Sequence, residues 1–133
     1  MKTGLSTPAN PVRWFEIYVQ DMARARRFYE GVLGRELQPL GPPELDMWSF
    51  ASELGLYGTG GALVSHPTMP SGGNSTVVYF SCEDCAVEEA RVATFGGTVV
   101  RPKMSIGPFG FVTLARDPDG NLVGLHSTAM PGA

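Results

Sequence analysis

Two stretches of the chain show the same succession of hydrophobic and polar positions. Residues 14–19, WFEIYV, alternate between an apolar side and a mixed side, which is the period of a half-buried strand. Residues 22–32 then place apolar side chains at the three- and four-residue spacing of an amphipathic helix. Residues 77–82, VVYFSC, and the segment after them repeat this order. The pattern predicts two copies of a strand followed by a helix.

Each predicted helix has matching signals at its two ends. Asp21 and Asp84 stand where an N-cap is expected, at a spacing of 84 − 21 = 63 residues. Gly34 and Gly97 lie at the same spacing and stand where a glycine would end each helix. Such an internal repeat describes two supersecondary units in one chain. We therefore expect the same local structure twice.

Further strands complete each unit, and loops rich in proline and glycine separate them. A short strand follows each glycine turn, at the ends of residues 12–37 and 75–100. The candidates for the remaining strands are residues 47–52, 60–66, 109–115 and 121–127. The chain is therefore predicted to be one α+β domain, residues 1–133, made of two β-α-β-β-β modules that bury their faces against each other. Module 1 covers about 12–66, the linker 67–74 and module 2 about 75–127.

The charge and composition of the chain argue against several classes of function. A net charge of −3 and a pI near 5.3 disfavour a protein that binds nucleic acid through its charge. No apolar run approaches the ~20 residues of a transmembrane helix, and the first residues lack the apolar core of a signal peptide. We therefore expect a cytoplasmic protein with no nucleic-acid or membrane partner. Cys82 and Cys85 form a lone CEDC, which favours structural cysteines.

One face of the first strand has an unusual composition. Glu16 shares it with Trp14 and Tyr18, and the equivalent of Glu16 in the second unit is Tyr79. Large aromatic side chains favour burial, whereas a carboxylate favours water or a partner. A cleft lined by both kinds of side chain satisfies both preferences. We therefore expect this face to line a cleft.

The closing strands of the two units can be aligned through their first glycines. Placing Gly60 on Gly120, a spacing of 120 − 60 = 60 residues, also places His66 on His126. Each unit then ends in a histidine at the same position. His126 alternates in step with Gly124, so we expect it to point into the cleft and away from the helix.

Four segments of the sequence resemble a known family. They are RWFEIYVQDMARARRFYEGVLG (13–34), GGALV (60–64), VVYFSCEDCAVEEA (77–90) and RDPDGNLVGLHS (116–127). Together they resemble the vicinal oxygen chelate superfamily, which includes glyoxalase I, bleomycin and fosfomycin resistance proteins and extradiol dioxygenases. The resemblance implies a small glyoxalase-like bacterial protein whose paired modules form a curved mixed sheet around a cleft. It also implies a homodimer, in which Glu16 and His126 of one cleft could come from different subunits.

The resemblance implies a metal site, and this chain departs from it at every ligand position. The family's ligands, His or Glu on the first and last strands of each module, fall on Trp14, Val77, Gly124 and near Val64. None of these side chains supplies the donors that such a metal needs. We therefore expect no metal cofactor at the usual site. A divalent metal could bind only at a displaced site formed by Glu16, His66 and His126.

Three hypotheses for the function follow. In the first, the cleft binds a small organic molecule without metal, and Glu16 and His126 fix its polar groups. The aromatic residues expected to supply the apolar surface are Trp14, Tyr18, Trp48, Tyr79, Phe109 and Phe111. In the second, Glu16 and His126 are catalytic in a lyase or isomerase, as an acid–base pair or as displaced metal ligands. In the third, they satisfy each other in a non-catalytic interaction domain.

Overall fold

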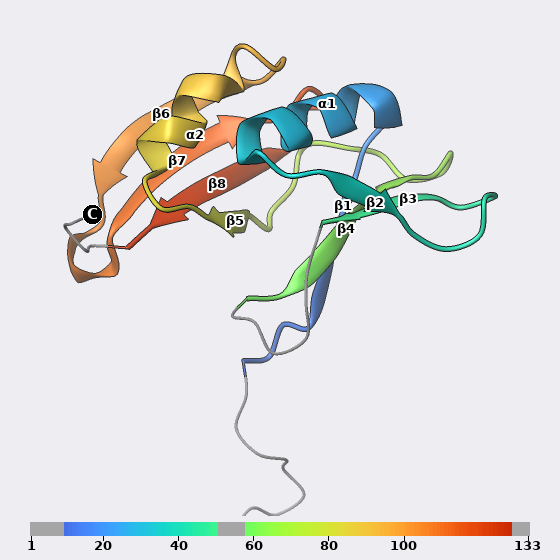
Figure 1. The fold of residues 1–133 in the computed structure, drawn as a ribbon, viewed down its shortest axis with the longest axis horizontal. Helices are drawn as coiled ribbons and strands as arrows, with labels where there is room; N and C mark the ends of the chain where they lie inside the picture. Colours follow the sequence, from blue (N-terminus) through green and yellow to red (C-terminus); the bar gives the residue numbers. More distant parts are fainter. Residues whose placement is uncertain (1–9, 51–57, 129–133) are drawn as a thin grey trace, which may run out of the picture.

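The computed structural model describes residues 10–50 and 58–128, which fold as two β-α-β-β-β-like modules (Figure 1). Module 1 contains β1 (Trp14–Tyr18), α1 (Met22–Leu33), β2 (Leu37–Pro39), β3 (Asp46–Phe50) and β4 (Gly60–Ser65). Module 2 contains β5 (Val78–Ser81), α2 (Cys85–Val92), β6 (Thr98–Ser105), the 3₁₀-helix η1 (Gly107–Phe109), β7 (Phe111–Arg116) and β8 (Leu122–Ser127). The predicted α+β class and the two modules are confirmed.

Some strand boundaries differ from the expected ones. β4 ends at Ser65, so His66 follows the strand and does not close it. Phe109 belongs to the 3₁₀-helix η1, and β7 begins two residues later. The last two residues of the expected strand 47–52 lie outside the described residues. These shifts place His66 after its expected strand and Phe109 in a 3₁₀-helix.

Each module has a four-stranded mixed sheet, and the two sheets have the same strand order. The order is β1-β4-β3-β2 in the first sheet and β5-β8-β7-β6 in the second. The first and last strands of each module are parallel neighbours, and the other neighbours are antiparallel. β1 and β5 therefore lie at sheet edges, where one side of the backbone has no partner strand in its own sheet.

The helices begin at the predicted caps. The Asp21 carboxylate accepts a hydrogen bond from the backbone N–H of Arg24 at 3.0 Å, and the Asp84 carboxylate accepts one from Ala86 at 3.0 Å. Gly34 ends α1 with a φ of 69°, which glycine adopts without steric cost. The helices have 12 and 8 residues, and no helix in the described part of the chain is long and apolar enough to cross a membrane.

Gly97 has a different role from the one expected. α2 ends earlier, at Val92, and the backbone N–H of Gly97 then bonds the Val92 carbonyl oxygen at 2.9 Å. A Cβ on Gly97 would overlap the ring of Phe28 and would lie 2.6 Å from the carbonyl oxygen of Arg116. The left-handed glycine after α2 is therefore one residue earlier than expected, at Gly96, whose φ is 99°. Glycine is needed here because module 2 and α1 approach each other closely.

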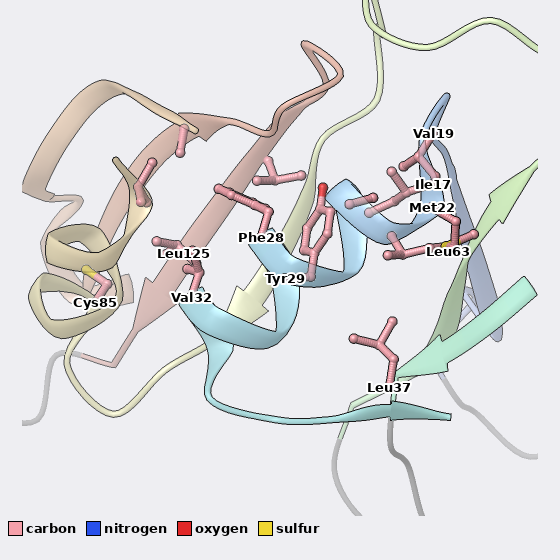
Figure 2. Packing of buried hydrophobic residues seen from close by; sticks show 14 residues of the cluster. Ile17, Val19, Met22, Phe28, Tyr29, Val32, Leu37, Leu63, Cys85 and Leu125 are labelled. Carbon is pink, nitrogen blue, oxygen red and sulfur yellow. The ribbon is translucent and has the colours of Figure 1, made fainter. Parts of the chain in front are cut away.

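Both modules contribute to one hydrophobic core, with α1 at its centre (Figure 2). The ring of Tyr29 in α1 lies 5.6 Å from Phe50 in β3 and 5.9 Å from Phe80 in β5, measured between centroids. The Tyr29 hydroxyl donates a hydrogen bond to Oδ2 of the buried Asp117 at 2.7 Å. Burial, followed by the charge of Asp117, raises the pKa of Tyr29 well above its usual value. The phenol therefore stays protonated and joins the modules as a donor.

Candidate functional site

Glu16 is the centre of a hydrogen-bonded group on the face of β1 that points away from the core. Its Oε2 accepts a hydrogen bond from Trp14 Nε1 at 3.2 Å, and its Oε1 accepts one from the Tyr18 hydroxyl at 2.8 Å. Strand alternation puts these three side chains on one face, while Phe15 and Ile17 join the core. The hydrogen bond to Glu16, followed by burial, raises the pKa of Tyr18. Tyr18 therefore remains a proton donor to the carboxylate.

A hollow of about 250 Å³ lies beside this group, where module 1 meets module 2. Its lining comes from β1, from the segment between β4 and β5, from β5 and from the start of β8. Glu16 and Tyr18 supply its charged and phenolic groups, and Asn74 and Thr76 supply neutral polar groups. We refer to this space below as the hollow.

Hydrogen bonds between distant parts of the chain hold the wall of the hollow. Asn121 is 7% exposed and directly follows the turn between β7 and β8. Its Nδ2 donates to the carbonyl oxygen of Tyr18 at 3.0 Å, and its Oδ1 accepts from the N–H of Gly72 at 2.7 Å. Ser71 Oγ donates to the same Tyr18 carbonyl oxygen at 2.5 Å. The end of β1 is therefore fixed to module 2 and to the segment between β4 and β5.

The sequence interpretation missed Asn121 and Asn74. Asn74 joins the wall to β8, because its Nδ2 donates to the Leu122 carbonyl oxygen and its Oδ1 accepts from the Leu122 N–H, both at 3.2 Å. For Asn121 a signal was available, since alternation puts it on the helix side of β8. A buried amide must find partners, so its position pointed to a polar network.

The other expected polar residue, His126, lies on the sheet of module 2 and outside the lining of the hollow. Its Nε2 lies 2.7 Å from the carbonyl oxygen of Phe109, which can only accept, so Nε2 carries the proton. The ring of Tyr79, which is 51% exposed, covers Gly124 on the same face. The Phe109 side chain is 72% exposed. Tyr79, Phe109 and His126 therefore lie on what we call the outer face of module 2.

The structure does not join Glu16 and His126 into a pair. Glu16 bonds to Trp14 and Tyr18 of its own strand, whereas His126 bonds to the backbone of Phe109. Within residues 10–50 and 58–128, no hydrogen bond or ion pair connects the two side chains. A single chain therefore does not form the acid–base pair of the second hypothesis, nor the mutually satisfied pair of the third.

Two aromatic residues expected in the cleft lie on the helix side of their sheets. Trp48 is paired with Leu63 and packs against the core, with the guanidinium carbon of Arg26 3.6 Å from its ring centroid. Phe111 also packs against the core, and the ammonium nitrogen of Lys103 lies 4.7 Å from its ring centroid. The structure therefore places both rings against the core and outside the lining of the hollow. The strand register decides the face, and a shift of one residue exchanges the two faces.

His66 is not the counterpart of His126. In module 1 the Val19 N–H donates to the carbonyl oxygen of Val64 at 2.9 Å, and in module 2 the Cys82 N–H donates to that of His126 at 2.7 Å. Val19 and Cys82 are equivalent residues, at the repeat spacing of 82 − 19 = 63. Val64 is therefore the counterpart of His126, and the expected alignment of the histidines is wrong by two residues. His66 is exposed in the turn after β4.

The donor set does not fit the metal that the family resemblance implies. By the observed register, Ala62 lies opposite Glu16 and Gly124 lies opposite Tyr79, so Ala62 and Gly124 occupy equivalent places in the closing strands. Neither residue has a donor atom in its side chain, and Trp14 at the start of β1 has no acceptor. No group of three His, Cys, Asp or Glu side chains comes together in the part of the chain that the structure describes.

Residues 12–125 match the model of the Glyoxalase/Bleomycin resistance protein/Dioxygenase superfamily. The chain therefore belongs to this superfamily, as the sequence resemblance implied. Comparison with curated proteins gives no match.

Three solved structures show the range of similar proteins. TnmS3, an antibiotic binding protein from Streptomyces sp. CB03234, is 29% identical with a TM-score of 0.67, over 92% of this chain and 99% of that chain. A glyoxalase/bleomycin resistance protein from the same organism is 31% identical with a TM-score of 0.63, over 86% and 98%. A glyoxalase I mutant from Zea mays has a TM-score of 0.68 over 88% and 46%, but at 20% identity it shows similarity in fold alone.

Proposed function

We propose that this protein binds a small organic molecule in the hollow beside Glu16, without the metal site of its family. The observation that carries the proposal is a carboxylate held by two aromatic side chains, Trp14 and Tyr18, next to a space of about 250 Å³. A few fixed polar groups in a largely apolar pocket are the usual arrangement of a small-molecule site. The similarity to TnmS3, an antibiotic binding protein, supports binding as the function.

In this proposal the residues of the site have separate roles. Glu16 fixes the polar group of the ligand, and Tyr18 offers ring surface from the lining of the hollow. Trp14 lies outside the lining and offers its ring beside Glu16. Trp14 is 43% exposed, so a large apolar area is still available for contact. Asn121 and Ser71 are positioning residues, because they hold the backbone of Tyr18.

The proposal includes a second copy of the chain. The hollow is slightly smaller than the ~300–1,000 Å³ of typical ligand pockets. Tyr79, Phe109 and His126 are absent from its lining, although their outer face carries exposed aromatic surface. We propose that a homodimer brings this face of one chain toward Glu16 of its partner, since modules of this family commonly pair across chains. A light-scattering mass equal to one 14.2 kDa chain removes this part of the proposal.

The test is a calorimetric titration with naphthylmethanol, a neutral probe with two aromatic rings. We expect saturable binding, and we expect Tyr18→Ala to weaken it by at least about fivefold because a ring of the lining is lost. His66→Ala is the matched control and leaves the affinity unchanged, because His66 lies outside the hollow. If neither naphthylmethanol nor its charged analogues bind, the proposal is wrong.

A further inference from the structure

We infer that the hollow selects organic cations, so that its ligand combines an apolar aromatic body with one protonated nitrogen bound to Glu16. This inference rests on the proposed function and names the chemical class of its ligand. It follows from the charge of the lining, from the partners of Glu16 and from the two ring faces beside it.

Among residues 10–50 and 58–128, the lining of the hollow has one ionised side chain, that of Glu16. The other lining residues are apolar or neutral, and none of them is lysine, arginine or histidine. A carboxylate attracts cations and repels anions even where it is exposed, as Glu16 is, and added salt screens both effects. A ligand with a phosphate or carboxylate group is therefore disfavoured, and a ligand with a positive charge is favoured.

The partners of Glu16 differ from those of the chain's ion-paired carboxylates. The three ion pairs of the described residues are Arg24–Asp119 at 2.6 Å, Lys103–Asp84 at 2.8 Å and Arg26–Glu30 at 3.1 Å. Glu16 belongs to none of them, and its two donors, Trp14 and Tyr18, are neutral groups. Neutral donors orient a carboxylate without cancelling its charge, so Glu16 keeps its full attraction for a cation.

The two hydrogen bonds also prepare the geometry of the site. A carboxylate offers about four lone-pair sites, and each oxygen of Glu16 accepts one hydrogen bond from the residues that the structure describes. Acceptor capacity for an ammonium group therefore remains on both oxygens. Because Trp14 and Tyr18 already hold the side chain, binding a ligand orders few additional rotamers.

The ring faces next to Glu16 carry no cation of the described residues. The three cation–π contacts in this part of the chain are Arg26 on Trp48, Arg27 on Phe95 and Lys103 on Phe111. Trp14 and Tyr18 take part in none of them. An indole ring is the best natural partner for a cation–π contact. A ligand ammonium on Glu16 therefore has an unused indole and phenol beside it.

The test compares three probes of one shape and different charge, namely naphthylmethylamine, naphthylmethanol and naphthoate. Their affinities are measured by calorimetry at neutral pH, where the amine is protonated and the acid is ionised. We expect the amine to bind about tenfold more tightly than the alcohol, which corresponds to ~1.4 kcal/mol, and naphthoate to bind most weakly. Added salt should weaken the binding of the amine and leave that of the alcohol unchanged.

Glu16→Gln separates charge from shape. The amide is neutral and nearly isosteric, so we expect the amine to bind this variant no more tightly than the alcohol does. Glu36→Gln is the matched control: it neutralises an exposed carboxylate outside the hollow and keeps the preference for the amine. Glu16→Asp retains the charge and is expected to retain part of the preference. Thermal unfolding establishes that each variant is folded.

The outcomes distinguish this inference from the proposed function. Equal affinities of amine and alcohol for the unmodified protein overturn the inference and leave small-molecule binding in place. If the folded Glu16→Gln variant prefers the amine as strongly as the unmodified protein does, the inference is also wrong and small-molecule binding again remains. If none of the three probes binds, both the inference and the proposed function are wrong.

Discussion

Cys82 follows β5 directly, and the negative charge of Glu88 disfavours ionisation of its half-buried thiol. Burial, followed by the charge of Glu88, raises the pKa of this thiol from 9.0 to about 12. A reactive or metal-binding cysteine needs the opposite shift, because the thiolate is the nucleophile and the ligand. Cys85, at the start of α2, is fully buried in the core. Both observations support the interpretation of CEDC as structural.

We predict that the Cys82 thiol reacts slowly and that its reaction rate, followed as a function of pH, does not level off near pH 9. In the Cys85→Ala variant, the rate of reaction with a small disulfide reagent should still rise between about pH 8 and pH 10, because the thiol ionises only near its raised pKa. The denatured variant should level off near its ordinary pKa of 9.0. A folded-state rate that also levels off there would contradict the raised pKa. Since the folded state holds this proton more tightly, stability should also fall as the pH rises from about 9 toward 12.

At the scale of the elements, β4 and β8 each carry a glycine that an aromatic ring of the parallel neighbour covers. Gly61 lies under Phe15 and Gly124 lies under Tyr79, and an added Cβ overlaps the ring in both cases. The two rings differ in their freedom to move. Phe15 is packed in the core, 5.9 Å from Phe80 between centroids, whereas Tyr79 is 51% exposed. Tyr79 can therefore turn into solvent more readily than Phe15.

We predict that Gly61→Ala destabilises the fold more than Gly124→Ala does. The first change must displace a packed ring and should lower the free energy of unfolding by about 2–3 kcal/mol. The second should cost less than about 1 kcal/mol, and Tyr79→Ala in the same chain should remove this cost, because the ring and the new Cβ no longer compete. Chemical denaturation of these variants gives the values. Equal losses at the two glycines would contradict the different packing of the two rings.

Features that depend on one element could be predicted from the sequence, whereas features that depend on pairing between elements could not. The caps at Asp21 and Asp84 and the alternation of β1 involve neighbouring residues, and the structure confirms them. The equivalence of His66 and His126 and the face of Trp48 depend on strand register. A slip of one residue reverses the faces of a strand, and no local pattern in these strands excludes such a slip.

The same distinction applies to the candidate site. Alternation along a single strand places Trp14, Glu16 and Tyr18 together, so the sequence predicts this part. Asn121 and Ser71 bond to the Tyr18 carbonyl oxygen from 103 and 53 residues away along the chain. Contacts over such separations require the two modules to be docked, and one sequence does not reveal how they dock.

At the scale of the whole molecule, one core connects the two modules. The buried cluster contains side chains from β1, α1, β2 and β4 of module 1 and from α2, β7 and β8 of module 2. The hydrogen bond from Tyr29 to Asp117, at 2.7 Å, crosses between the modules inside this cluster. Each module alone has one small sheet and one short helix, so its part of the cluster would face water.

We therefore predict that the chain unfolds as one cooperative unit. Both tryptophans, Trp14 and Trp48, belong to module 1, so their fluorescence reports that module, whereas circular dichroism reports both. Leu125→Ala removes a buried side chain of module 2 and should cost about 2–5 kcal/mol, shifting both transitions equally to lower denaturant. Val87→Ala, at an exposed position of α2, is the control. It should change the free energy of unfolding by no more than about 0.5 kcal/mol in either signal. Leu125→Ala could instead leave the fluorescence transition at its original denaturant concentration and split the dichroism signal into two transitions. This result would show that module 1 folds without module 2.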